Sequence, residues 1–139
     1  MKAEGTKNRV RGMTKRDYLE TRQRGDLYMN SFELFTMIFF TLDAYWDEHK
    51  GEELGQFLSS MNPFLFEDIG SAVPDIYNDY CSWLGERSIT INNSYMIAKE
   101  YVDKLNKGFI KEAFGWIDSE RWVESCQRFL AEPHKGVDK

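Results

Sequence analysis

The most apolar stretch of the chain, MNSFELFTMIFFTLDAYW at residues 29–46, restricts the possible folds more than any other feature. Apolar residues recur there at steps of three and four, the spacing of one helix face, and a second apolar row runs beside the first. A helix that is apolar around most of its girth belongs in the middle of an all-α packing. We expect Ser31 to cap this helix, with Glu33 in its first turn. The first row is Phe32, Phe35, Phe39, Leu42 and Trp46, and the second is Leu34, Ile38, Thr41 and Tyr45.

The same stretch fits neither a membrane span nor a signal peptide. A spanning helix needs about 20 mostly apolar residues, whereas Glu33 and Asp43 enclose a run of only nine, Leu34–Leu42. A signal peptide needs a basic region joined directly to an apolar core and a small-residue cleavage site. Asp26 and Glu33 interrupt that approach, and no such site follows. We therefore expect a cytoplasmic protein with no membrane partner.

The rest of the chain predicts shorter helices separated by helix-breaking residues such as Pro63 and Gly85. Residues 63–73 predict a loop whose apolar start packs against the core, and SITI at residues 88–91 predicts a short extended piece. The fold class is thus all-α, a compact bundle of five or six helices around a central apolar helix at about residues 31–47. The expected shorter helices cover residues 51–61, 74–84, 94–106, 109–117 and 119–132, with Asn93 or Ser94 capping the third and Asp118 or Ser119 the last.

The expected domain spans residues 29–132, between a basic N-terminal segment and a loose tail of residues 133–139. Residues 1–24 carry a net charge of +5, so the remaining chain carries −10. Residues 1–28 lack a sustained apolar period, which predicts disorder. Alternatively they are an over-annotated leader, with translation beginning at Met29. A basic arm can bind nucleic acid, but the acidic body opposes such binding, so we expect no nucleic-acid partner.

No motif predicts a metal, a cofactor or a catalytic nucleophile. The histidines, His49 and His134, lie far from each other and from the cysteines, which does not match a compact metal motif. Cys81 and Cys126 lie among apolar residues with no nearby histidine, which predicts buried, reduced thiols. The segment EELGQ resembles an acidic motif of all-α, magnesium-dependent pyrophosphohydrolases, but Gln56 stands where their second carboxylate is needed. We therefore expect a protein that is not an enzyme, with a metal-dependent nucleotide hydrolase as the minor alternative.

Acidic residues alternate with aromatic residues in NPFLFEDIGSAVPDIYNDYCSWL, residues 62–84. Aromatic anchors surrounded by carboxylates suit a partner with a basic surface. Alternatively, the aromatic side chains belong to the core and the acids lie on the outside of the same helix. The acids are Glu67, Asp68, Asp75 and Asp79, and the aromatic residues are Phe64, Phe66, Tyr77 and Tyr80.

Two segments, MNPFLFEDIGSAVPDIYNDYCSWL and NNSYMIAKEYVDKLN, resemble the small acidic helical immunity proteins of bacterial polymorphic and contact-dependent toxin systems. The resemblance implies a non-catalytic inhibitor, monomeric or weakly dimeric, that covers the basic cleft of a cognate toxin domain. A helical structural or regulatory subunit, self-associating through the aromatic face, is the alternative. The candidate partner-binding residues are Glu67, Asp68, Asp75, Tyr77 and Asp79.

Overall fold

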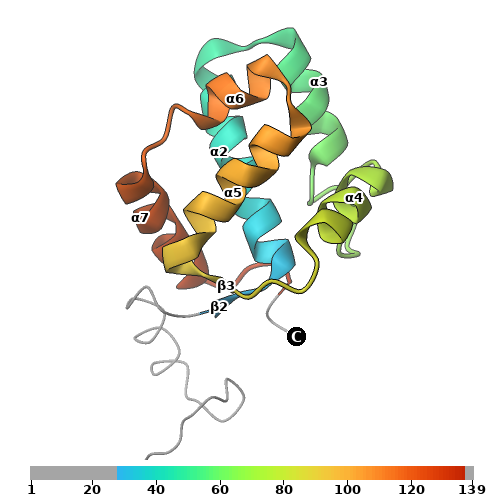
Figure 1. Ribbon diagram of the computed structural model, residues 1–139. Helices are drawn as coiled ribbons and strands as arrows, with labels where there is room; N and C mark the ends of the chain where they lie inside the picture. Colours follow the sequence, from blue (N-terminus) through green and yellow to red (C-terminus); the bar gives the residue numbers. More distant parts are fainter. Residues whose placement is uncertain (1–27, 137–139) are drawn as a thin grey trace, which may run out of the picture.

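The computed structural model describes residues 28–136 and confirms the all-α fold (Figure 1). Six helices make up most of this part of the chain, and a two-stranded ribbon joins its beginning to the start of α5. The N-terminal segment of residues 1–27, with its predicted disorder and alternative start, lies outside the described residues. The elements are β2 (Tyr28–Met29), α2 (Ser31–His49), α3 (Glu52–Met61), α4 (Pro74–Leu84), β3 (Ile89–Thr90), α5 (Ile91–Leu105), α6 (Gly108–Phe114) and α7 (Ser119–Leu130).

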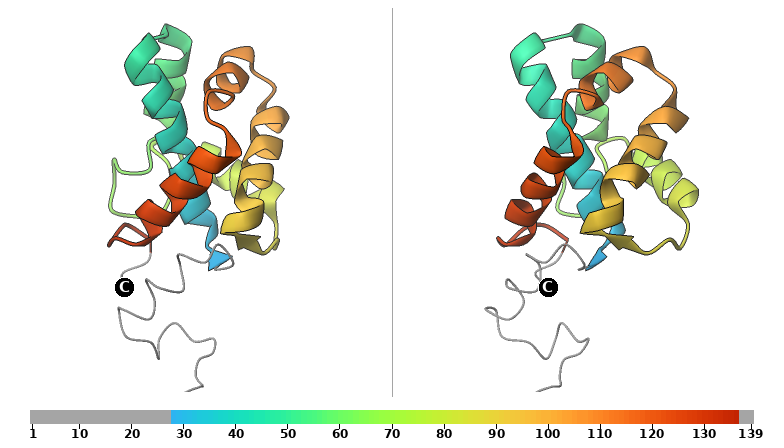
Figure 2. Two further views of the ribbon diagram at one scale, coloured as in Figure 1. Left: turned by 90° about the vertical axis from the view of Figure 1, so that its left-hand side faces the viewer. Right: turned by 60° about the vertical axis from the view of Figure 1, so that its left-hand side comes forward.

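Helix α2 is the central helix that the sequence predicts. It packs against α3, α4, α5 and α6, and Figure 2 shows it running the length of the molecule. The predicted cap is wrong by one residue. Asn30 caps the helix because its Oδ1 accepts a hydrogen bond from the backbone N–H of Glu33 while the Glu33 carboxylate accepts one from the N–H of Asn30.

The core follows both predicted apolar rows of α2 through most of their length. Phe35, Ile38 and Leu42 are fully buried, together with side chains from α4 and α7 such as Tyr80 and Trp122. The rows end before the last two turns, where the side chains become half-exposed. The core therefore lies around the first three turns of α2 rather than along all of it.

Trp46 is the member of the predicted buried row that departs from it. Its side chain is only half-buried, and its Nε1 donates a hydrogen bond to the carbonyl oxygen of Gly51, 2.9 Å away. The indole lies against Gly55 of α3 so closely that an added Cβ would stand 2.9 Å from Nε1. Gly55 therefore lets α3 fold back onto the end of α2.

The extended piece predicted at residues 88–91 is confirmed in part, because Ile89–Thr90 pair antiparallel with Tyr28–Met29. Helix α5 begins immediately afterwards, earlier than the predicted caps at Asn93 or Ser94. Thr90 is the cap: its Oγ1 accepts a hydrogen bond from the N–H of Asn93, and the Asn93 Oδ1 accepts one from the N–H of Thr90. The predicted cap of α7 at Asp118 is confirmed, since its carboxylate accepts from the N–H of Arg121.

The expectation of a loose tail is wrong for residues 134–136. His134 Nε2 lies 2.7 Å from the buried carboxylate of Glu33, and the Nδ2 of Asn30 donates to the carbonyl oxygen of Gly136. These two contacts hold the tail over the N-terminus of α2, where Glu33 lies. Residues 137–139 lie outside the described part of the chain. Among residues 28–136, no helix combines the length and the apolar character needed to cross a membrane.

Candidate functional site

The loop between α3 and α4, residues 62–73, carries the largest group of exposed apolar side chains on the described surface. The predicted packing of its apolar start against the core is confirmed for Pro63, which is buried, and in part for Phe64, whose ring meets the buried Phe39 edge-on. It does not hold for the residues that follow, since Ser71 is the only other buried residue of this loop. Glu67 and Asp68, which are also exposed, lie in the middle of the apolar group. The exposed apolar residues are Phe64 at 45%, Leu65 and Phe66 at 59%, Ile69 at 50% and Val73 at 44%.

Backbone hydrogen bonds hold the two ends of the α3–α4 loop together. The N–H of Ala72 donates to the carbonyl oxygen of Asn62, and the N–H of Val73 donates to that of Ser60, each over 2.9 Å. The Asn62 side chain also accepts from the N–H of Phe64 at 2.8 Å, which closes a tight turn at the start of the loop. The exposed side chains are thus displayed from a fixed base.

Lys135, from the tail, holds the first half of the loop. Its ammonium donates to the carbonyl oxygens of Pro63 and Phe66, at 2.6 and 2.5 Å. Loss of hydration lowers the pKa of Lys135, while the carboxylates of Asp68 and Glu67 act in the opposite direction. The ammonium of Lys135 is therefore hydrogen-bonded to the loop backbone.

Phe64 extends the loop onto the surface of α2. Its ring stacks on Phe40, with centroids 5.6 Å apart and planes inclined by 22°. Phe40 is 38% exposed and also meets Phe129 of α7 edge-on. The apolar surface therefore continues from the loop over α2 toward α7.

The aromatic residues of α4 point toward the core, unlike the exposed aromatic residues of the loop. Tyr80 is fully buried, and its hydroxyl donates to the carbonyl oxygen of Ser31 at 2.6 Å. Tyr77 is half-buried and meets the rings of Phe32 and Phe35 edge-on. Burial is the main cause that raises the pKa of Tyr77 to about 12. The two interpretations of the acidic-aromatic segment thus apply to different parts of it, with surface aromatics in the loop and core aromatics in α4.

Four of the five predicted contact residues are exposed, and Tyr77 is the exception. Asp75 and Asp79 lie one turn apart on α4, directly after the loop that carries Glu67 and Asp68. Residues 51–86 contain seven acidic residues and no Lys or Arg, so the tail residue Lys135 is the cation that acts on Glu67 and Asp68. The loop and the outer face of α4 therefore form one acidic surface with an apolar part in the loop.

Sequence reasoning missed the remaining apolar members of the surface, Phe40, Leu65, Ile69 and Val73. For the loop residues a signal was present, because residues 64–73 are rich in large apolar side chains but have no period that would place them on one buried face. Phe40 and Lys135 gave no such signal. Each was recognisable only once α2, the loop and the tail lay side by side.

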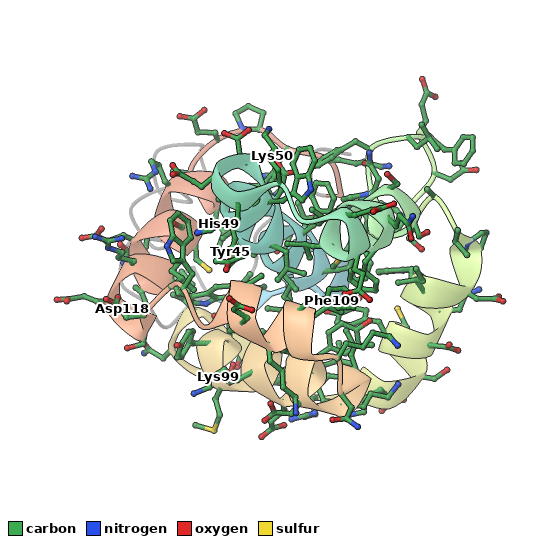
Figure 3. All side chains as sticks on the ribbon, turned by 90° about the horizontal axis from the view of Figure 1, so that it is seen from above. Tyr45, His49, Lys50, Lys99, Phe109 and Asp118 are labelled. Carbon is green, nitrogen blue, oxygen red and sulfur yellow. The ribbon has the colours of Figure 1, made fainter. Side chains whose placement is uncertain are left out.

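A second aromatic cluster lies at the end of α2, on the side shown in Figure 3. His49 stacks on Tyr45 with ring centroids 3.9 Å apart, and Trp116 meets both edge-on. The Tyr45 hydroxyl donates to Glu112 of α6 at 3.0 Å. These contacts join α2 to α6 and to the segment that follows it, and we assign the cluster a packing role.

The thiols and carboxylates of residues 28–136 form no evident reaction centre. Burial raises the pKa of Cys126 to about 12, so this thiol is protonated at neutral pH. No three His, Cys, Asp or Glu side chains within this range are grouped so that they would hold a metal ion. The α3–α4 loop is therefore the candidate site, and its chemistry is that of recognition. None of the protein-family models, curated proteins or solved structures compared with this chain matches it.

Proposed function

We propose that this protein is a non-catalytic binding module that recognises a basic protein partner through the α3–α4 loop and the outer face of α4. One observation carries the proposal: five large apolar side chains are exposed around Glu67 and Asp68, on a loop that hydrogen bonds hold at both ends. Monomeric proteins rarely leave contiguous apolar surface uncovered, and such patches commonly mark interaction sites.

The chemistry of the surface indicates the partner. Phe64 and Phe66 offer aromatic anchors, the residue type that dominates binding energy at protein interfaces. The carboxylates of Glu67, Asp68, Asp75 and Asp79 form no ion pair among the described residues, although the Lys135 ammonium attracts Glu67 and Asp68 from its place on the loop backbone. These carboxylates can therefore pair with Arg or Lys of a partner. With nine basic against eighteen acidic residues in the range 28–136, the body attracts a basic partner over long range and raises the association rate.

The specific form of the proposal is an immunity protein that covers the basic cleft of a toxin domain. It rests on the resemblance of residues 61–84 and 92–106 to that class and on the acidic, apolar surface. A second copy of the chain is a poorer match for the same surface, because two faces that each carry Glu67, Asp68, Asp75 and Asp79 repel each other. Self-association through the loop is therefore an alternative that light scattering tests directly.

The product of the adjacent gene is the partner to test. We expect the purified chain to bind it and to inhibit it, with binding measured by titration calorimetry. Replacing Phe66 by Ser should weaken the complex about thirtyfold or more, as loss of an interface anchor does. The matched control is Met96→Ser on α5, which is 62% exposed and lies away from the loop.

A charge pair of variants completes the test. Glu67→Lys should slow association and make its decrease with salt shallower, because a repulsive charge replaces an attractive one, whereas Glu124→Lys on α7 should change the rate far less. Absence of any complex with a neighbouring gene product would contradict the immunity role. Equal binding by the Phe66→Ser and Met96→Ser variants would contradict the assignment of the α3–α4 loop.

A further inference from the structure

A small pocket lies between the second half of the α3–α4 loop and the start of α4. Its volume is about 240 Å³, below the range of roughly 300–1,000 Å³ that is usual for small-molecule sites. Gly70 has a φ of +152°, which other residues rarely adopt, and this conformation turns the chain around the pocket. A space of this size suits one side chain of a partner. Its lining includes Phe66, Ile69, Pro74, Asp68, Asn62 and Asn78.

The pocket lies beside the N-terminus of α4, a position that often attracts anions. Here the local groups oppose that use. Pro74 has no N–H, the N–H of Tyr77 donates to the Ser71 hydroxyl, and the N–H of Ile76 donates to the carbonyl oxygen of Val73. Asp68 lines the pocket, and Lys135, the nearby cation that attracts Asp68, donates to the carbonyl oxygens of Pro63 and Phe66 and forms no ion pair with the Asp68 carboxylate. The charge of the site therefore selects a cation.

The walls and the polar groups select one kind of cation. Phe66 presents an exposed ring, and Ile69 and Pro74 add apolar surface along which an aliphatic stem can lie. The Asn78 side chain has no hydrogen-bond partner among the described residues, so its oxygen is available beside the Asp68 carboxylate. A guanidinium group is flat, stacks on aromatic rings and donates up to five hydrogen bonds, whereas an ammonium is a compact point charge.

We propose that this pocket receives an arginine side chain of the basic partner. The guanidinium pairs with Asp68 and stacks on Phe66, while Asn78 accepts one of its remaining N–H groups. The proposal rests on the proposed function for its biological role and deepens it, because it names the residue by which the partner is recognised. The apolar side chains on either side of the pocket then dock the surface around that arginine.

The test uses the full chain without any partner. N-acetyl-argininamide is titrated into the ¹⁵N-labelled protein, and the amide signals of Gly70 and of the Asn62 and Asn78 side chains are followed by NMR. We expect saturable shifts confined to these residues, in the millimolar range. N-acetyl-citrullinamide, which has the same shape and no charge, should produce shifts at least about fivefold smaller at the same concentration.

Two variants make the result specific to the pocket. Asp68→Asn should weaken arginine binding about threefold to fivefold, the size expected for a partly exposed ion pair, whereas Asp103→Asn on the outer face of α5 should leave it unchanged. Inorganic phosphate is the opposing probe. Saturable shifts with phosphate but not with the arginine probe would overturn the proposal in favour of an anion site.

Diffuse shifts over the whole acidic surface that are equal in both variants would also contradict arginine binding at the pocket. They would leave the proposed function in place. No saturable shift at tens of millimolar arginine probe would contradict arginine binding at the pocket as well. Conversely, binding at the pocket combined with no loss of partner affinity on Asp68→Asn or Phe66→Ser would contradict the proposed function and leave a cation site. The two failures are therefore distinguishable.

Discussion

The α3–α4 loop and helix α4 follow each other along the chain and share the same alternation of acidic and aromatic residues, yet they place their aromatic rings on opposite sides. Phe64 and Phe66 of the loop are exposed, whereas Tyr80 of α4 is fully buried and Tyr77 packs on α2. The acids of both regions are exposed. The alternation of acidic and aromatic residues thus indicates that the carboxylates are exposed, but it does not indicate whether the aromatic rings are exposed or buried.

The difference has a simple physical origin. In α4, Tyr77, Tyr80 and Leu84 recur at three and four residues, so the helix turns all of them toward α2 and α5. The loop has no regular period, and its ends are held close together by one hydrogen bond from Ala72 to Asn62 and one from Val73 to Ser60. A closed loop of that kind has no single inner face large enough for five apolar side chains.

The largest expected effect separates the two regions by their contribution to stability. Tyr80→Ala should cost about 3–5 kcal/mol of the free energy of unfolding, because it empties a fully buried site. Phe66→Ala should cost less than about 1 kcal/mol, since the ring is mostly exposed. Urea unfolding measures both, with Tyr80→Phe separating the hydroxyl from the ring. Similar costs for the two alanine variants would break the comparison.

The next effect tests the tail that supports the loop. His134→Ala should cost about 3 kcal/mol, because it removes the imidazole from a buried carboxylate. The control is His49→Ala, an exposed histidine whose loss should cost well under half as much. Combining His134→Ala with Glu33→Gln should cost less than the sum of the two single changes. Additive costs would show that the two groups are not coupled.

Alkaline pH should weaken the buried side of α4 more than the loop. Burial raises the pKa of Tyr101, which packs on Tyr80, from 10.0 to about 12. The unfolded chain therefore releases this proton first, so the stabilisation is complete below about pH 10 and is lost as the pH rises toward 12. We expect Tyr101 to account for a loss of about 2 kcal/mol over that window, measured by urea unfolding as the difference from the Tyr101→Phe variant. Tyr77, whose pKa burial also raises to about 12, adds to the total loss. Tyr101→Phe should reduce the loss, and an unchanged pH profile in this variant would contradict the assignment.

The smallest expected effect on global stability concerns the support of the α3–α4 loop by Lys135. Lys135→Met keeps the aliphatic stem but removes the donor to the Pro63 and Phe66 carbonyl oxygens. We expect less than about 1 kcal/mol of global destabilisation, because the loop lies outside the core, together with faster hydrogen exchange at residues 64–70. Lys111→Met, on the exposed face of α6, serves as the control. Unchanged exchange in the loop would show that Lys135 does not hold it.

Periodicity predicted the helices well because burial of one face is a local property of the sequence. The central helix, the all-α class and the cap at Asp118 were accessible in this way. The half-exposed position of Trp46 and the cap at Thr90 could not be predicted in this way, because each depends on a hydrogen bond that apolar spacing does not reveal. For the candidate site, the alternation of residues 62–84 correctly predicted exposed acids. It could not predict which aromatic residues lie on the surface and which lie in the core.

Residue spacing and composition indicate that the chain folds as helices around residues 31–47 and that residues 51–86 carry negative charge and no Lys or Arg. The outward position of Phe64 and Phe66, the contact of the tail with Glu33 and the support of the loop by Lys135 depend on tertiary contacts. The reason is distance along the chain. Local spacing fixes which residues share a helix face, whereas the loop contacts Lys135 about 70 residues away and the tail contacts Glu33 about 100 residues away.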